Sequence, residues 1–316
     1  MTIRPPVPSD RELPSVSVIV PIYNASGVLQ TTLPSWLSQD TSAEWLLVDD
    51  GSSDDTAELL SSMAGATMQV LRHSRNRGRA AARNTGIAAA TGEVLLFLDA
   101  DMRPEPDFVR QHAIAHSDPD VIGVVSNPIL EDLDLANPYH RYLRSRRGAA
   151  GVGPGKPLPF RYFIIGYTSV KAAAVAAVGG FDEQFSYGED LDFAYRLAQR
   201  YPDALRFSDR PVVHHYDHGD LDGRLRKLRE FGRDNLPALL AKHPGLAAAA
   251  KVDFVDSPSQ PRSWEASLKR WALKPGLVAP LRRLLPYAPP PMSDVVIRYV
   301  LAASIAEAFR NSVSPS

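Results

Sequence analysis

The sequence lacks cysteine, and this absence narrows the chemistry open to the protein. None of the 316 residues is cysteine, so disulfide bonds, thiolate nucleophiles and thiolate metal sites are excluded. Any bound metal ion must be held by Asp, Glu, His or water. A chain without cysteine also fits a reducing compartment, and we predict a cytoplasmic location.

Long hydrophobic runs and an excess of positive charge are also missing. The longest apolar candidate, "VVIRYVLAASIAEAF", is broken by Arg298 and Glu307 and falls short of the roughly 18 to 20 residues that span a bilayer. Residues 1–13 are rich in proline and have no apolar core, so we expect a disordered lead-in and not a signal peptide. The formal net charge of −1 disfavours a nucleic-acid partner.

Short apolar runs of strand length alternate with helical patterns in the first half of the chain. The runs span residues 16–23, 44–50, 68–73 and 93–99. Their nearly continuous hydrophobicity is typical of strands that are buried on both faces. We therefore predict an α/β fold, an open, doubly wound, mostly parallel sheet flanked by helices, with a helical extension at the C-terminal end.

Polar residues follow three of these strands where each one ends. They are Tyr23-Asn24, Asp49-Asp50, and Asp99 with Asp101. Asp and Asn often leave strands through turns, which would explain any one of these pairs. Ligands, however, bind at the carboxyl ends of strands in open α/β sheets, and carboxylates gathered there repel one another unless a cation lies between them. The oxygen ligands indicate Mg²⁺ or Mn²⁺ bound together with a phosphate group.

Six motifs in a fixed order make the chain recognisable. They are "VSVIVPIYN", "LLVDDGSSDDT", "NRGRAAARNTGI", "GEVLLFLDAD", "GGFDE" and "GEDLDFAYRL", and together they resemble the family 2 glycosyltransferases of the GT-A fold. The resemblance runs from Val16 to about His218. It implies an inverting transferase that takes a sugar from a nucleotide diphosphate donor with the help of a divalent metal, Mn²⁺ or Mg²⁺.

The resemblance also assigns roles to residues at the strand ends. Asp50 would hydrogen-bond the nucleobase, with Asp49 supporting its loop, and Asp99 would contact the ribose or a metal-bound water. Asp101 would ligate the metal, with Asp99 as a further candidate ligand. The remaining positions that it assigns to the nucleotide sugar are Pro21, Tyr23, Asn24, Asn76, Arg79, Arg83 and Ala100.

The catalytic base falls at "GED" by the same resemblance, with Asp190 ahead of Glu189. Acidic residues in the first turn of a helix also complement the helix dipole, so capping is an alternative explanation. A histidine in "VVHHYDHGD" would complete the metal site, with His214 favoured and His215 next. Adjacent residues of a strand point to opposite faces, so at most one of the two can face the site, and a structural pair is equally open.

These assignments divide the chain into four segments. After the lead-in, we expect residues 14–125 to bind the nucleotide sugar, and residues 126–235 to bind the acceptor and carry the base, with a mobile loop at 140–160. Residues 236–316 form the helical extension. Within it, the basic, tryptophan-containing stretch 262–285 predicts either peripheral attachment to a membrane or ordinary packing on the catalytic domain.

We expect a carbohydrate or a lipid-linked acceptor, and this expectation rests on analogy with the family alone. The segment before "GGFDE" commonly faces the acceptor in the family, and here it reads "GYTSV" and departs from the family pattern. Two other functional classes remain open. One is a sugar-nucleotide-binding protein without catalysis, and the other is a nucleotidyltransferase, although "PIYNASG" lacks the lysine-containing loop that such an enzyme would carry after its first strand.

Overall fold

The computed structural model describes residues 13–63, 65, 67–216, 218–255 and 271–313. The chain divides into two compact units. The sheet unit comprises Met1–Glu131 and Gly148–Tyr216, and the helical unit comprises Asp132–Arg147 and Asp217–Ser316. The predicted lead-in lies outside the described residues except for Leu13. The chain thus changes unit after 131, 147 and 216. The functional division at 125 and 235 stays a prediction.

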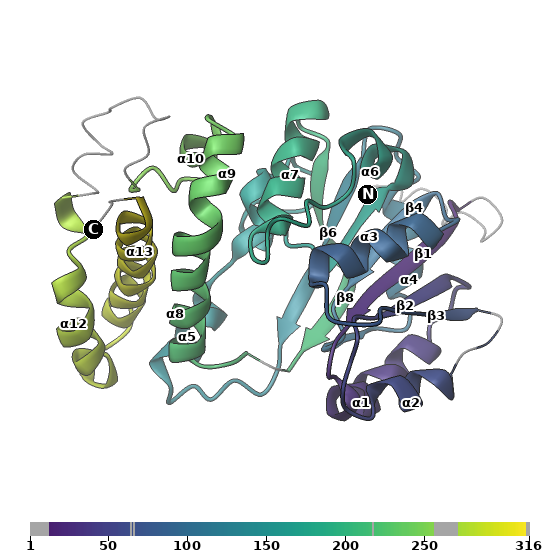
Figure 1. Ribbon diagram of the computed structural model, residues 1–316, viewed down its shortest axis with the longest axis horizontal. Coiled ribbons are helices and arrows are strands. Elements are labelled where there is room, and N and C mark those ends of the chain that lie inside the picture. Colours follow the sequence, from purple (N-terminus) through teal and green to yellow (C-terminus); the bar gives the residue numbers. More distant parts are fainter. Residues whose placement is uncertain (1–12, 64, 66, 217, 256–270, 314–316) are drawn as a thin grey trace, which may run out of the picture. The chain divides into compact units, whose positions relative to one another are not determined.

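An eight-stranded sheet forms the centre of the sheet unit (Figure 1). Its strand order is β3-β2-β1-β4-β7-β6-β8-β5. Within the described residues, β3, β2, β1 and β4 are mutually parallel, as are β6 and β8, whereas β7 and β5 run antiparallel to their neighbours. The prediction of a mostly parallel α/β sheet is confirmed. The strands are β1 Val16–Ile22, β2 Glu44–Asp49, β3 Met68–Arg72, β4 Val94–Leu98, β5 Met102–Pro104, β6 Gly123–Leu130, β7 Tyr167–Lys171 and β8 Leu205–His215.

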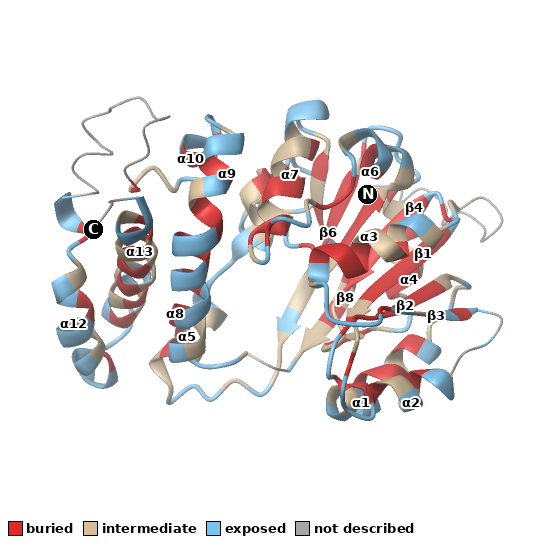
Figure 2. Cartoon of the chain, viewed as in Figure 1, coloured by how far each residue is buried: buried red, intermediate tan, exposed pale blue. Residues whose placement is uncertain are grey.

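Helices cover both faces of the sheet, as a doubly wound fold requires (Figure 2). Val18 and Val20 of β1 share one core with side chains of three helices. On the opposite face, Phe97 of β4 makes an edge contact with Phe193. The helices of the first face are α1 Ser26–Leu37, α2 Thr56–Ser61 and α4 Phe108–Ala115, and those of the second are α3 Arg79–Ala89, α6 Ala172–Val178 and α7 Glu189–Arg200.

Helix α3 packs closely on the sheet at Gly86, and apart from Arg83 its buried residues are small. A Cβ atom at Gly86 would lie 2.4 Å from Ile19 Cγ2, so glycine is required there. Ala80, Ala81 and Ala82 are also buried. This close packing holds the beginning of α3, with Arg79 and Arg83, near the carboxyl ends of β1 and β4.

The helical unit has its own core. Leu225, Val300 and Ala303 belong to one buried cluster, and Tyr139 and Ile297 belong to another. Helix α5 lies partly within 140–160, where the sequence predicts a mobile loop. The elements of this unit are α5 Pro138–Ser145, α8 Leu221–Glu230, the π-helix η3 Phe231–Asn235, α9 Leu236–Lys242, α10 Leu246–Ala249, η4 Pro275–Leu277, α12 Val278–Leu284, η5 Leu285–Tyr287 and α13 Met292–Val313.

Two short helical turns, η1 Gly148–Gly151 and η2 Phe160–Tyr162, follow α5 in the chain and belong to the sheet unit. Helix α13 has 22 residues. Among the described residues, neither it nor any other helix combines the length and the hydropathy needed to cross a bilayer. The structure therefore contains no spanning segment in the parts that it describes.

Candidate active site

The ends of β1 and β2 are joined by hydrogen bonds between the turns that follow them. Asn24, which has a left-handed φ of 46°, donates its backbone N–H to Ser52 Oγ, and its Oδ1 accepts from the backbone N–H of Ser53, at 2.9 Å in both cases. Tyr23, next to it, is 49% exposed, and Pro21 is half-buried on β1. Asn24 therefore fixes the turn, while the Tyr23 ring stays accessible to a ligand.

Asp49 supports its loop, as the resemblance implies. The residue is completely buried. Its Oδ1 accepts a 2.9 Å hydrogen bond from the backbone N–H of Ser52, and its Oδ2 lies 3.1 Å from Arg72 Nε. The carboxylate thus closes the turn after β2 and joins β2 to β3.

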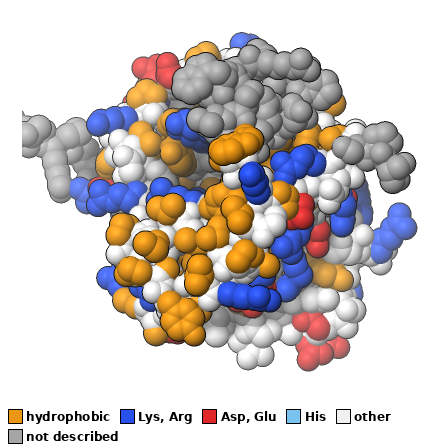
Figure 3. All heavy atoms as spheres, turned by 90° about the vertical axis from the view of Figure 1, so that its left-hand side faces the viewer, with side chains coloured by type: hydrophobic (Ala, Val, Ile, Leu, Met, Phe, Trp, Pro, Cys, Tyr) orange, Lys and Arg blue, Asp and Glu red, His pale blue; other side chains and the backbone are white. Residues whose placement is uncertain are grey.

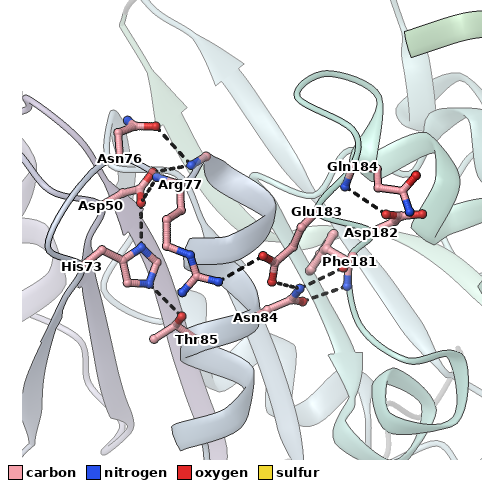
Figure 4. A network of polar contacts seen from close by, with 11 residues as sticks. Asp50, His73, Asn76, Arg77, Asn84, Thr85, Phe181, Asp182, Glu183 and Gln184 are labelled. Atoms are coloured by element: carbon pink, nitrogen blue, oxygen red, sulfur yellow. Dashed lines mark hydrogen bonds and ion pairs between the residues drawn. The ribbon is translucent and has the colours of Figure 1, made fainter.

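Both carboxylate oxygens of Asp50 are hydrogen-bonded within the protein, whereas the resemblance implies only a contact with the nucleobase (Figure 4). Its Oδ1 lies 2.7 Å from His73 Nδ1 and accepts a 2.8 Å hydrogen bond from the backbone N–H of Arg77. Its Oδ2 accepts from the backbone N–H of Gly78 at 2.8 Å, and His73 Nε2 lies 2.8 Å from Thr85 Oγ1. The carboxylate shapes the loop that leads into α3, and its contact with a nucleobase stays a prediction.

The "GGFDE" loop is fastened to α3 by a second set of contacts in Figure 4. Asn84 and Phe181 form a reciprocal pair, because the Asn84 side chain donates to Phe181 O at 2.8 Å and accepts from Phe181 N–H at 2.9 Å. Glu183 accepts from Asn84 Nδ2 at 3.0 Å and from Arg77 Nη2 at 3.2 Å. A Cβ atom on Gly180, which has a φ of 68°, would lie 2.8 Å from Asn84 Oδ1. The motif therefore has a structural role, because its contacts with α3 fix the position of the segment that precedes α7.

Arg83 connects the end of β4 to the beginning of α7. Its guanidinium, only 1% exposed, donates from Nη1 to Glu189 Oε1 and from Nη2 to Asp99 Oδ1, at 2.9 Å in both cases. Burial disfavours the charged guanidinium, but the charges of Asp99 and Glu189 more than offset this and raise the pKa of Arg83. Gly166 lies directly beside this pair, because a Cβ atom there would lie 2.1 Å from Asp99 Oδ2.

Asp190 stands at the beginning of α7, next to this bridged pair. Its carboxyl is desolvated by burial and faces the negative charge of Glu189, and these two effects raise the pKa of Asp190 to about 6, although the positive charge of Arg83 opposes them. Its Oδ1 accepts a 2.8 Å hydrogen bond from the backbone N–H of Leu191. A carboxylate with a pKa near 6 is a better proton acceptor than an ordinary one and is still ionised at neutral pH.

The structure places His215, and not the favoured His214, against Asp101. His215 Nε2 lies 3.2 Å from Asp101 Oδ2. His214 points to the other face of β8, where Nε2 and Nδ1 each lie 2.7 Å from a carboxylate oxygen, of Glu105 and Glu131 respectively. Both ring nitrogens of His214 are thus engaged by carboxylates, and a metal-ligand role for His214 or His215 stays a prediction.

The groups at the start of β5 and the end of β8 suit a divalent metal. Asp101 Oδ1 is buried and has no hydrogen-bond partner among the described residues, so one carboxylate oxygen is left for a ligand. His215 brings an imidazole nitrogen beside it. In the described part of the chain, no group of three or more His, Asp or Glu residues could hold a metal alone. Asp101 and His215 would therefore share an ion with oxygens of a bound diphosphate and water.

The remaining predicted residues lie around this edge. Ala100 is half-buried in the turn between β4 and β5. Asn76 Oδ1 accepts from Gly78 N–H at 3.1 Å. Arg79 is half-exposed, with its guanidinium 5.7 Å from the centre of the Tyr187 ring and 3.6 Å from Glu189 Oε1. Arg79 is thus a cation at this edge with access to solvent.

Sequence reasoning missed a side chain that the structure brings to the site. His73 supports Asp50, and its position directly after β3 was the available signal. Arg103, whose guanidinium stands 4.3 Å from the centre of the Tyr216 ring, pairs across the strands with His214 and so shares the His214 face of the β5–β8 pair.

Comparison with known proteins identifies the class to which this site belongs. The model of the family described as "Glycosyl transferase family 2" matches residues 17–173. The pre-mycofactocin glycosyltransferase of Mycobacterium tuberculosis (strain ATCC 25618 / H37Rv) is 28% identical over 256 residues, which cover 78% of this chain and 51% of that protein. The undecaprenyl-phosphate 4-deoxy-4-formamido-L-arabinose transferase of Sodalis glossinidius is 34% identical over 122 residues, or 36% of this chain and 37% of that protein.

Solved structures share the fold at low sequence identity. The mannosyltransferase PcManGT from Pyrobaculum calidifontis, in complex with GDP-Man and Mn²⁺, superimposes with a TM-score of 0.59 at 21% identity, covering 94% of this chain and 88% of that one. TarS 1-349 of S. aureus, in complex with UDP-GlcNAc, gives a TM-score of 0.56 at 16% identity, covering 94% and 92%. These similarities concern the fold, which is the GT-A fold of glycosyltransferases.

The chain belongs to glycosyltransferase family 2, as the resemblance implies. It spans about half the length, or less, of the curated relatives that it matches first. Membership therefore establishes a family 2 domain with a GT-A fold, while the reaction of this protein has to be argued from its own residues.

Proposed function

We propose that the protein transfers a sugar from a nucleotide diphosphate donor to an acceptor hydroxyl with inversion at the anomeric carbon. The observation that carries this proposal is the Arg83 bridge, which joins Asp99 at the end of β4 to Glu189 at the start of α7. This bridge holds the strand end that leads to Asp101 and the helix start that carries Asp190 on the same side of the sheet.

Each group then has one role. Tyr23 and Pro21 line the nucleobase pocket, Arg79 contacts the diphosphate, and Asp190 receives the proton of the acceptor hydroxyl. Asp101 and His215 would hold Mn²⁺ or Mg²⁺, which stabilises negative charge on the departing diphosphate when it is bound. The relatives fit this assignment, because PcManGT was solved with GDP-Man and Mn²⁺ and TarS with UDP-GlcNAc.

The order of proton transfer follows from the pKa values. A sugar hydroxyl resembles water, with a pKa of about 16, while the pKa of Asp190 is about 6. Removing the proton in a separate first step would cost roughly 14 kcal/mol. We therefore place the transfer to Asp190 late, while the oxygen attacks the anomeric carbon in line with the leaving diphosphate. A single displacement of this kind inverts the anomeric centre.

The acceptor class is part of the same proposal. One relative in this comparison is named for transfer onto undecaprenyl phosphate, which supports a lipid-linked or carbohydrate acceptor for this chain. Work on such an acceptor would occur at a membrane surface, from the cytoplasmic side that the sequence predicts.

A donor panel tests the reaction directly. The release of nucleoside diphosphate from UDP-, GDP- and dTDP-sugars is measured with Mn²⁺, for the wild type and for Asp190→Asn. We expect turnover with one donor class, its loss in Asp190→Asn, and donor binding retained in that variant. Binding without turnover in the wild type would point to a non-catalytic sugar-nucleotide-binding protein. Formation of a nucleotide sugar from a nucleoside triphosphate would point to a nucleotidyltransferase.

A further inference from the structure

The helical unit exposes an unusual number of large apolar side chains in one short stretch of the chain. Between residues 271 and 298, six such side chains are solvent-exposed, up to 85% for Tyr287. Isolated exposed apolar residues are common, but a cluster of this kind marks a binding surface. We call the cluster the apolar face; it consists of Trp271, Leu277, Leu284, Tyr287, Met292 and Val295.

These residues lie on α12, α13 and the turns beside them. Leu284 is on α12, Leu277 in η4 directly precedes that helix, and Tyr287 in η5 follows it. Met292 and Val295 are three residues apart on α13. Other side chains of both helices are used inside the unit, where Val278 of α12 and Val300 of α13 lie in the same buried cluster. The apolar face is therefore left over after the unit has formed its core.

Positive charge surrounds this face. Residues 271–298 contain Lys274, Arg282, Arg283 and Arg298 and a single acidic residue, Asp294. Figure 3 shows Lys and Arg side chains gathered among hydrophobic ones on this side of the molecule. Asp294 accepts a 2.6 Å hydrogen bond from Ser145 Oγ. The face thus combines apolar surface with a net positive charge.

Two of the cations remain available to an external anion. Arg282 pairs with Asp222, and Lys274 stands 5.0 Å from the centre of the Trp271 ring. Arg283 and Arg298 are exposed and form no ion pair with any residue that the structure describes. Arg283 also lines a cavity of about 500 Å³ with Arg282, Tyr139 and Leu285.

From these observations we infer that the apolar face docks the protein on an anionic lipid bilayer. Tryptophan and tyrosine side chains partition to the interface between lipid and water, leucine, methionine and valine insert below it, and arginine contacts lipid phosphates. A bilayer with anionic lipids can bury the apolar side chains and at the same time pair the cations with lipid phosphates. A second copy of the chain would not, because a two-fold interface places the same positive patch against itself.

The inference narrows the sequence prediction of a membrane contact through 262–285. Residues 262–270 lie outside the described residues, and the structure moves the emphasis to 271–298, including Tyr287, Met292 and Val295, which lie beyond the predicted stretch. It goes beyond the proposed function, since lipid binding needs neither the donor nor the metal.

Co-sedimentation of the full chain with vesicles tests this inference. We expect binding to vesicles of phosphatidylglycerol and phosphatidylcholine, weaker binding to phosphatidylcholine alone, and loss of binding as salt rises. The double variant Tyr287→Ser/Met292→Ser removes apolar groups, and Arg283→Glu reverses one charge without touching the apolar face. Each should reduce the bound fraction at a fixed lipid concentration, the double variant by about tenfold.

Matched controls come from the sheet unit. Leu37→Ser removes a side chain that is 62% exposed, and Arg210→Glu changes the charge by the same amount as Arg283→Glu. Both should bind vesicles like the wild type. No binding to anionic vesicles, equal losses in the controls, or a dimer that Tyr287→Ser/Met292→Ser converts to monomer in sedimentation would each overturn the inference. Turnover with a water-soluble acceptor is measured in parallel, so a failure here is distinguishable from failure of the proposed reaction.

Discussion

The carboxyl group of Asp190, the proposed catalytic base, would serve the reaction at the expense of the fold. Its pKa is raised to about 6, mainly by desolvation and then by Glu189. The folded protein therefore holds this proton more tightly than the unfolded chain, in which the pKa is near 3.8. Ionisation of Asp190 thus lowers the stability of the folded state progressively as the pH rises from about 4 to about 6, and the full loss is present above about 6.

Asp190→Asn should consequently be inactive but more stable than the wild type at pH 7.5. We expect a loss in turnover of about 10²-fold to 10⁴-fold and a gain in unfolding free energy of about 1–3 kcal/mol. The gain should disappear near pH 4, where Asp190 is protonated in the folded wild type. Urea unfolding at both pH values measures this, and equal stability at pH 7.5 would show that the carboxyl is not desolvated.

The buried guanidinium of Arg83 should be the most sensitive single position of the site. Arg83→Met removes the buried cation between Asp99 and Glu189, and we expect a loss of about 3–5 kcal/mol in unfolding free energy. Arg79→Met is the matched control, because Arg79 is half-exposed and lies 3.6 Å from the same Glu189 oxygen. We expect the control to lose less than about 1 kcal/mol. Equal losses would contradict the bridging role.

At the scale of elements, the antiparallel β5–β8 pair decides which histidine lies beside Asp101, the proposed metal ligand. His215→Ala should raise the Mn²⁺ concentration for half-maximal activity by about tenfold or more, because it removes a nitrogen beside Asp101. His214→Ala should leave this concentration unchanged, since His214 faces Glu105 and Glu131. The opposite pattern in the two titrations would show that β8 presents its other face.

Helix α4 is attached to β6 and β7 through a buried histidine cluster that should respond to acid. His112 contacts Ser169 and Ser126 at 2.7 and 2.8 Å, and His116 contacts Ser169 at 2.8 Å. Desolvation, helped by the charge of Lys171, lowers the pKa of His116 to about 4, and desolvation lowers the pKa of His112 as well. Both side chains are therefore neutral in the folded protein.

The free energy of unfolding should fall as the pH drops from about 6.5 toward 4. In this range the two histidines bind protons in the unfolded chain but remain neutral in the folded protein. Unfolding free energies of the wild type and of His116→Gln, measured between pH 7.5 and 5, check this expectation. The variant should lose less stability over the interval than the wild type does. An identical slope would assign the acid sensitivity to other groups.

Across the whole molecule, the sheet unit was predictable and the contacts inside the site were not. Strand periodicity and six motifs in order indicated the GT-A fold and the strand-end carboxylates. Arg83 lies 16 and 106 residues from its two partners, so no local pattern could reveal the bridge. Because adjacent residues of a strand point to opposite faces, only one of His214 and His215 could face the site. The pairing of β8 with β5, which places His215 beside Asp101, is a tertiary feature that the sequence does not show.

Helix α5 of the helical unit could not be predicted from its own segment for a similar reason. Residues 132–147 are rich in arginine and look like a loop, yet α5 forms there because Tyr139 and Tyr142 pack with Leu285 and Ile297. Asn137 caps this helix by accepting a hydrogen bond from Tyr139 N–H at 2.8 Å. The low helix propensity of the segment was outweighed by the burial of its two tyrosines against residues about 150 positions later in the chain.

The central claim concerns a divalent ion shared by Asp101 and a nucleoside diphosphate. Calorimetric titration of the wild type and of Asp101→Asn with UDP and GDP, with and without Mn²⁺, tests it most directly. The account predicts that Mn²⁺ tightens binding of one diphosphate at least about tenfold in the wild type and has little effect in Asp101→Asn. Equal affinities with and without Mn²⁺ in the wild type, or an unchanged Mn²⁺ effect in the variant, would contradict it.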